Sequence, residues 1–193
     1  MNWKSCKYLL VADLQRVQSD CGYIAGIKTY LKNTPFRVVF WFRLGSYLKE
    51  KRDILSKVLY GVSVFILKRC KNKTGIQLNV GTVIGPGLRF PHFSCIVINH
   101  EAVLGKNCTI FQGVTIGKIK GPKGGVPIIG DNVVISSGAK VIGNIKVGNN
   151  VMIGANAVVN KDVPDGAVVV GVPGKVVNYN GKENVVLYIG DSF

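Results

Sequence analysis

The chain has 193 residues, 47% of them hydrophobic, and its 25 Lys and Arg against 10 Asp and Glu give a net charge of +15. The 24 glycines indicate many tight turns, and the 7 prolines exclude a collagen-like or Pro-rich disordered chain. The basic excess favours polyanions such as phosphorylated coenzymes, lipid headgroups or nucleic acid. No nucleic-acid-binding motif accompanies it, so we expect no nucleic acid partner.

Residues 1–75 are predicted to form a helical region. Apolar residues recur at helical spacing over 36–50 and 52–70, and a third helix is predicted over 8–18. Pro35 favours a helix start directly after it. We interpret these apolar stripes as the surfaces through which the helices pack on one another.

Three features of the chain predict a cytoplasmic protein. The apolar run before Asp13 is too short for the core of a signal peptide. The longest apolar stretch, 58–67, is too short for a bilayer span, which needs ~20 residues, although a helix lying on a membrane surface is compatible with it. The cysteines have no CxxC spacing and predict neither disulfides nor a zinc site: Cys6, Cys21, Cys70, Cys95 and Cys108.

Residues 76–177 repeat with a period of six. Large aliphatic residues occupy every sixth position in two runs, and an apolar residue follows nearly every one of them four positions later. Period six suits a solenoid of triangular cross-section, in which each hexapeptide forms one side and stacked coils pair in parallel around one core. The large residues are Ile98, Leu104, Ile110 and Ile116 in one run, and Ile129, Ile135, Val141, Val147, Ile153 and Val159 in the other.

The repeat lapses at two places that are candidate functional positions. Between Ile116 and Ile129, the basic and glycine-rich stretch 118–125 predicts a loop that leaves the coil. Near His92 the phase slips by two residues, which lets this side chain project. Because histidine titrates near ~6.5, we predict His92 as a catalytic base and a structural or surface role for His100. Two histidines cannot form a three-His zinc site, and no metal is expected.

Four segments resemble the serine acetyltransferase family of hexapeptide-repeat acyltransferases: PHFSCIVI at 91–98, FQGVTIG at 111–117, GAKVIGN at 138–144 and GVPGKVV at 171–177. The DLQRV stretch at 13–17 is similar to the helical start of that family's cores. The resemblance implies a mainly β protein, a left-handed parallel β-helix that follows an N-terminal α-helical region and precedes a tail at 178–193. It also implies a homotrimer or a dimer of trimers with active sites between subunits.

The same resemblance implies direct transfer of an acetyl group from acetyl-CoA to a hydroxyl acceptor. His92 stands at the family's catalytic base, and a backbone N–H would hold the developing oxyanion. Acetyl-CoA contacts are implied for residues around the pantetheine arm and for a lysine suited to the phosphates, with further lysines in support. These are Lys118, Ser137 and Ala155 for the arm, Lys175 for the phosphates, and Lys120 and Lys123 in support.

Several positions depart from the family's acceptor site. Gln77 stands where the family has an Asp that pairs with the base, and Pro91 replaces a second Asp. A Gln orients an imidazole but does not stabilise imidazolium as a carboxylate does. Gly125 and Val126 replace an Arg-His pair that grips serine's carboxylate, and Asp20 matches an acceptor-binding Asp with a spacing one residue short. The donor and the reaction therefore carry over better than serine as the acceptor. The chain also resembles the serine-acetyltransferase-like enzymes that acetylate sugars during polysaccharide synthesis, and this resemblance implies a sugar hydroxyl as the acceptor.

Alternatives stay open on the sequence alone. The first is L-serine as acceptor, giving O-acetylserine for cysteine biosynthesis. The second is a non-catalytic β-helix that only binds a ligand. The third is a charge-driven binder of nucleic acid or of a membrane surface.

Overall fold

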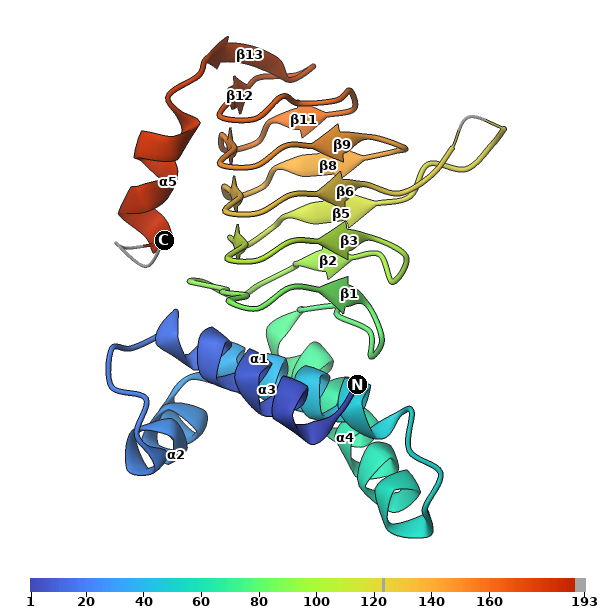
Figure 1. Ribbon diagram of the computed structural model, residues 1–193. Coiled ribbons are helices and arrows are strands. Elements are labelled where there is room, and N and C mark those ends of the chain that lie inside the picture. Colours follow the sequence, from blue (N-terminus) through green and yellow to red (C-terminus); the bar gives the residue numbers. More distant parts are fainter. Residues whose placement is uncertain (123, 190–193) are drawn as a thin grey trace.

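The computed structural model describes residues 1–122 and 124–189, and in it a solenoid of short strands stands on a layer of helices (Figure 1). The coils of the solenoid pair in parallel, one above the other. This confirms the predicted β-helix with an N-terminal helical region. Among the described residues, no helix is both long and apolar enough to cross a membrane.

The helical layer contains α1 (Trp3–Gln15), α2 (Tyr23–Lys32), α3 (Thr34–Leu48) and α4 (Ile54–Thr74). Helices α1, α3 and α4 lie where the apolar spacing predicts helices, with ends that differ by a few residues. The sequence pattern does not predict α2. It has only ten residues, and its apolar side chains, which recur at helical spacing, are largely exposed.

Polar caps fix where three of these helices begin. The side chains of Asn2, Asn33 and Asp53 each accept a hydrogen bond of 2.8 Å from a backbone N–H three residues on. Such caps satisfy N–H groups that the first turn of a helix leaves without partners. Helix α4 ends at Thr74 and is followed by the capping residue Gly75, whose φ of 70° is readily adopted by glycine.

A buried ion pair joins the helical layer to the first coil. The Arg43 Nε of α3 donates to Asp13 Oδ2 of α1 over 2.8 Å, and both side chains are almost fully buried. Arg43 also donates to the carbonyls of Ile84 and Gly85, and Asp13 Oδ1 accepts from the Leu88 N–H at 2.8 Å. Burial raises the pKa of Asp13, while the Arg43 charge opposes that effect.

The described strands form three sheets, one for each side of the prism. In the order of their hydrogen bonding they are β1-β3-β6-β9, β13-β12-β10-β7-β4 and β11-β8-β5-β2. The strands are β1 (Val83–Ile84), β2 (Val97–Ile98), β3 (Val103–Leu104), β4 (Thr109–Ile110), β5 (Thr115–Gly117), β6 (Ile128–Ile129), β7 (Val134–Ile135), β8 (Lys140–Ile142), β9 (Lys146–Val147), β10 (Met152–Ile153), β11 (Val158–Val159), β12 (Val168–Val170) and β13 (Lys175–Asn178).

The hexad residues fill the interior of the prism. The large residues of both runs are at most 3% exposed, and the apolar residues four positions later are at most 6% exposed. Val97 pairs with Thr115 and Ile98 with Ile116, so identical hexad positions stack. One corner is held by a ladder of asparagines, in which Asn107 donates to Asn132 and Asn132 to Asn150 over 3.0 Å each.

The two segments after the hexads cap the solenoid and cover one side. Strand β13 turns back to pair antiparallel with β12. Helix α5 (Gly181–Ile189) then runs down the β10 and β7 side, where Val185 and Ile189 pack on Val134 (Figure 1). The expected tail at 178–193 therefore contains a helix that the sequence pattern does not predict.

Candidate active site

His92 lies at a corner of the lowest coils, in the turn that precedes β2. Its side chain is exposed, as the slip in the hexad phase predicts. Among the described residues, no group hydrogen bonds to its imidazole. The ring instead faces Phe111 of the next coil, with 6.2 Å between the two centroids.

The corner that carries His92 continues up the solenoid. Backbone hydrogen bonds stack its turns: Gly113 donates to the Ser94 carbonyl at 2.8 Å, Gly138 to Gln112 at 2.9 Å, and Asn156 to Ser137 at 2.9 Å. We call this column of turns the His92 corner. Ser137 and Ala155 occupy successive turns of it, and the Val172-Pro173 turn that leads into Lys175 stands above them. With ~4.8 Å between paired strands, the column from Ser94 to this turn is roughly 19 Å tall.

A pocket of about 340 Å³ opens beside His92 at the foot of this corner. The turn between α2 and α3 forms its other wall. Its lining residues are Lys32, Asn33, Thr34, Pro35, Pro91, His92 and Phe93. Lys32 is the cationic side chain among them, and no carboxylate belongs to this lining. The pocket therefore offers an acceptor a base, a cation and an apolar wall.

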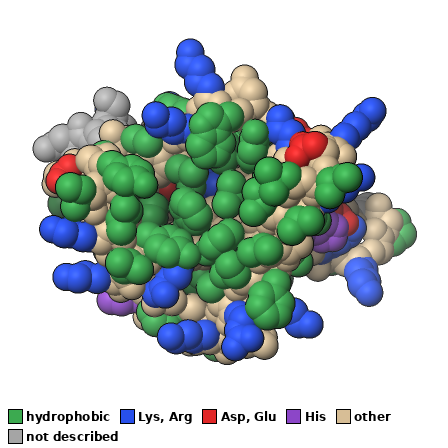
Figure 2. All heavy atoms as spheres, turned by 90° about the horizontal axis from the view of Figure 1, so that it is seen from below, with side chains coloured by type: hydrophobic (Ala, Val, Ile, Leu, Met, Phe, Trp, Pro, Cys, Tyr) green, Lys and Arg blue, Asp and Glu red, His purple; other side chains and the backbone are tan. Residues whose placement is uncertain are grey.

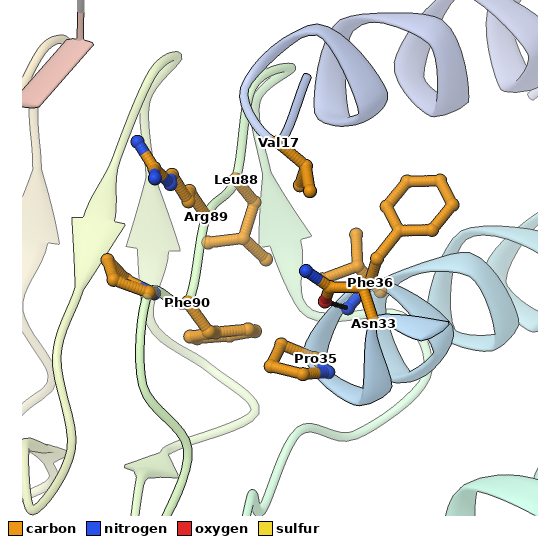
Figure 3. Close-up of a pocket in the computed structure, with 9 residues that line it drawn as sticks. Val17, Asn33, Pro35, Phe36, Leu88, Arg89 and Phe90 are labelled. Atoms are coloured by element: carbon orange, nitrogen blue, oxygen red, sulfur yellow. Dashed lines mark hydrogen bonds between the residues drawn. The ribbon is translucent and has the colours of Figure 1, made fainter. Parts of the chain in front are cut away.

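A smaller recess of about 100 Å³ lies behind the first pocket and shares Asn33, Pro35 and Pro91 with it. Figure 3 shows Leu88 and Phe90 of the lowest coil directed toward the start of α3, with Phe36 and Pro35 opposite them. Asn33 is held here because its side chain accepts a hydrogen bond from the Phe36 N–H at 2.8 Å. The packing of the start of α3 against Leu88 and Phe90 fixes the position of the wall that faces His92.

In the described part of the chain, neither Gln77 nor Asp20, two predicted site residues, hydrogen bonds to His92. The backbone of Gln77 pairs with the coil above, where its N–H donates to Ile96 at 2.7 Å, and its side chain is exposed. Asp20 is also exposed and accepts from the Gly22 N–H at 2.8 Å. Pro91, by contrast, lines the pocket next to His92.

The C-terminal helix supplies a neighbour of the site that the sequence does not reveal. Tyr188 of α5 packs edge-on against Phe111, with 5.6 Å between the centroids. Arg16 donates to the Ile189 carbonyl at 2.8 Å, and Arg89 donates to the Tyr188 carbonyl at 3.3 Å. Burial lowers the pKa of Arg16 to about 10. These arginines hold the end of α5 against the wall that His92 faces.

Lys118 lies at a different corner from Ser137 and Ala155. Its Nζ forms an ion pair with Glu101 at 2.7 Å, and His100 lies 3.7 Å from the same carboxylate. The hydrogen bond from Lys118 lowers the pKa of Glu101. His100 thus has a surface position within a charged cluster.

The predicted loop is a hairpin that projects from this second corner (Figure 1). Ile119 and Gly125 pair antiparallel at its base. Lys120 is exposed on the hairpin, and Lys123 lies outside the described residues. Lys175 is exposed at the first position of β13.

Comparisons with known proteins agree with this architecture. A family model described as bacterial transferase hexapeptide (six repeats) matches residues 127–161. The serine acetyltransferase of Bacillus pumilus is 40% identical over 84% of this chain and 71% of its own length. That of Synechococcus elongatus is 35% identical over 89% of this chain and 69% of its own length.

Solved structures give the same result. A serine acetyltransferase in complex with CoA superposes with a TM-score of 0.71 at 28% identity, covering 91% of this chain and 71% of that one. The Neisseria gonorrhoeae serine acetyltransferase in complex with serine gives a TM-score of 0.73 at 29% identity, covering 91% and 70%. These matches establish the left-handed β-helix and acetyl-CoA as the co-substrate. The chain is thus an acetyl-CoA-dependent O-acetyltransferase and belongs to the serine acetyltransferase family.

Proposed function

We propose that the chain transfers the acetyl group of acetyl-CoA to the hydroxyl of L-serine, with His92 as the general base. The relatives at 35–41% identity carry the name serine acetyltransferase, and one neighbouring structure is a complex with serine. They favour serine over the sugar acceptor that the sequence analysis expects. The observation that carries the proposal is the pocket at His92, which holds an exposed base and the cation of Lys32.

The proposed reaction needs two proton transfers, one to His92 and one from it. The imidazole of His92 takes the proton of the acceptor hydroxyl as its oxygen attacks the thioester carbonyl. A backbone N–H of the adjacent turns stabilises the oxyanion that develops. Breakdown of the tetrahedral species forms the ester, releases the thiolate of CoA and returns the proton from His92 to that sulfur. We propose that Gln77 orients the imidazole of His92.

The His92 corner suits a long thioester substrate. Small side chains at Ser137 and Ala155 leave the column open, and the turn that carries Lys175 stands roughly 19 Å above its foot. We assign the pantetheine arm to this column and the phosphates to Lys175, with Lys120 in support. A metal has no role in this mechanism, and a thioester donor suits a cytoplasmic enzyme.

A homotrimer accounts for the separation of Lys118 from the other coenzyme residues. In one chain Lys118 and Ser137 occupy different corners, so a single subunit does not bring them together. Packing of one subunit's second corner beside the His92 corner of its neighbour unites them. We therefore propose active sites between subunits of a trimer or a dimer of trimers.

A sugar hydroxyl is the second candidate acceptor, and a specific observation favours it. Gly125 and Val126 provide no cation for a carboxylate, and the pocket wall contains Phe93, Pro91 and Pro35. Apolar and aromatic surfaces of this kind pack against the C–H faces of sugar rings.

A thiol-release assay with acetyl-CoA distinguishes the two acceptors. The purified chain is offered L-serine, D-serine and a panel of nucleotide sugars, and the ester product is identified by mass spectrometry. We expect saturable release with L-serine and none with D-serine. Release with a nucleotide sugar but not with L-serine would replace the first candidate by the second, and no release with any acceptor would contradict both.

A further inference from the structure

The end of the molecule opposite the solenoid exposes an unusual number of large apolar side chains. Figure 2 views this end and shows hydrophobic atoms gathered across it, with Lys and Arg side chains around the margin. Helices α2 and α4 contribute most of them: Tyr23, Ile24, Ile27, Leu31, Ile54, Leu55, Val58, Leu59, Val62 and Phe65. We call this surface the basal face. Contiguous apolar patches of this kind mark interaction sites.

The apolar residues of α4 form a second face that its own packing does not use. Ile54, Val58 and Phe65 recur at helical spacing and fall on one side of the helix. The buried residues of α4, including Ser63 and Leu67, lie on another side, which packs against α3. Ile54 is 82% exposed, so the fold itself does not account for an isoleucine at this position.

Helix α2 repeats the arrangement. Tyr23, Ile27 and Leu31 lie along one side of the helix, and Tyr23 is 85% exposed. A groove of about 560 Å³ opens beside Tyr23 and Ile27, between α2, α1 and α3, and most of its lining is apolar. Two separate helices thus leave stripes of apolar side chains exposed to solvent.

The charges around the basal face decide between its possible occupants. Residues 51–74 contain seven Lys and Arg and one acid, Asp53, whose side chain caps α4. Lys28 adds positive charge beside the stripe of α2. Two copies that met through this face would bring their cationic margins together, which is unfavourable. A surface of anionic lipid headgroups complements the margin and accepts the apolar side chains at its acyl boundary.

We propose that the basal face binds the surface of an anionic membrane, with the apolar stripes of α2 and α4 at the headgroup boundary and the surrounding Lys and Arg on lipid phosphates. The solenoid then stands away from the bilayer, with its upper coils in water. This places acetyl transfer next to a membrane without a spanning helix. The proposal is independent of which acceptor the enzyme uses.

Vesicle flotation tests the proposal directly. The full chain is mixed with phosphatidylcholine vesicles or with vesicles that also contain phosphatidylglycerol. We expect flotation with the anionic vesicles, little with the neutral ones, and a decrease as salt is added, because salt screens the cationic margin. Equal binding to both kinds of vesicle, or to neither, would overturn the proposal.

Matched variants locate the binding surface. Leu55→Glu/Phe65→Glu alters two side chains that are 69% and 57% exposed, and we expect an about tenfold loss of anionic-vesicle binding with an unchanged circular dichroism melt. Leu187→Glu alters a side chain of α5 that is 80% exposed and should bind like the unmodified chain. Sedimentation velocity without lipid provides the counter-test. If the double variant lowers the oligomeric mass and leaves vesicle binding intact, the basal face joins protein copies and the proposal is wrong.

Discussion

The ring of Phe111 stands between two other rings, with its centroid 6.2 Å from that of His92 and 5.6 Å from that of Tyr188. This row connects the proposed base to the C-terminal helix. Because no hydrogen bond among the described residues holds the imidazole, ring packing is the contact that orients it.

Replacement of Phe111 tests this positioning role. Phe111→Ala should lower kcat severalfold with a smaller change in KM, and should cost about 2 kcal/mol of unfolding free energy through lost packing. Steady-state kinetics and urea denaturation measure the two effects. Tyr188→Phe, which keeps the ring pair, should change neither. If Phe111→Ala lowers the unfolding free energy but leaves kcat unchanged, Phe111 has a packing role only.

The two histidines should respond differently to substitution. His92→Ala removes the proposed base and should lower kcat by ~10²- to 10⁴-fold, since general-base catalysis contributes on that order. His100→Ala alters an exposed ring beside Glu101 and should leave kcat nearly unchanged. The thiol-release assay at saturating acetyl-CoA measures both. Equal losses in the two variants, or none in His92→Ala, would refute the assignment of the base.

Lys32 should discriminate between the candidate acceptors. If the acceptor is L-serine, Lys32→Ala loses a charged hydrogen bond to the carboxylate, and KM for serine should rise by roughly tenfold. Lys32→Arg keeps the charge and should retain most of the affinity. KM for acetyl-CoA serves as the internal control. A KM for serine that does not respond to Lys32→Ala would assign carboxylate recognition to another residue.

The buried pair between Asp13 and Arg43 should dominate the stability of the junction between helices and solenoid. Asp13→Ala leaves a buried guanidinium without its partner, and we expect a loss of about 3–5 kcal/mol in urea unfolding. Lys106→Ala breaks an exposed pair with Asp131 and should cost less than about 1 kcal/mol. Comparable losses of unfolding free energy in the two variants would contradict the larger contribution that we assign to the buried pair.

The solenoid could be predicted from the sequence because each side of each coil needs a large aliphatic residue at the same interior position. Ile129 and Ile153 occupy the interior by the same rule, so a period of six is visible without any knowledge of distant contacts. The exposure of His92 followed from a break in that rule. Strand-level details, such as the antiparallel return of β13, carry no such repeat.

Other parts of the site depend on contacts that local patterns do not contain. Helix α5 is short, and it is held by packing of Val185 on Val134 and by hydrogen bonds from Arg16. Short helices are marginal without such tertiary support, so propensity does not reveal them. The pocket wall at Lys32 was not predicted because residues 32–35 meet residues 91–93 only in the folded chain, a contact between distant segments that no local pattern contains.

Both ends of the β-helix are covered by other structure, the lower by α1 and α3 and the upper by the reversed strand β13 (Figure 1). An uncovered coil would offer a row of unpaired N–H and C=O groups to the end of another solenoid. The two covers therefore prevent solenoids from pairing end to end. A fragment that lacks residues 1–75 would expose its first coil and the apolar underside of Ile76 and Leu88, and it would tend to grow into fibres.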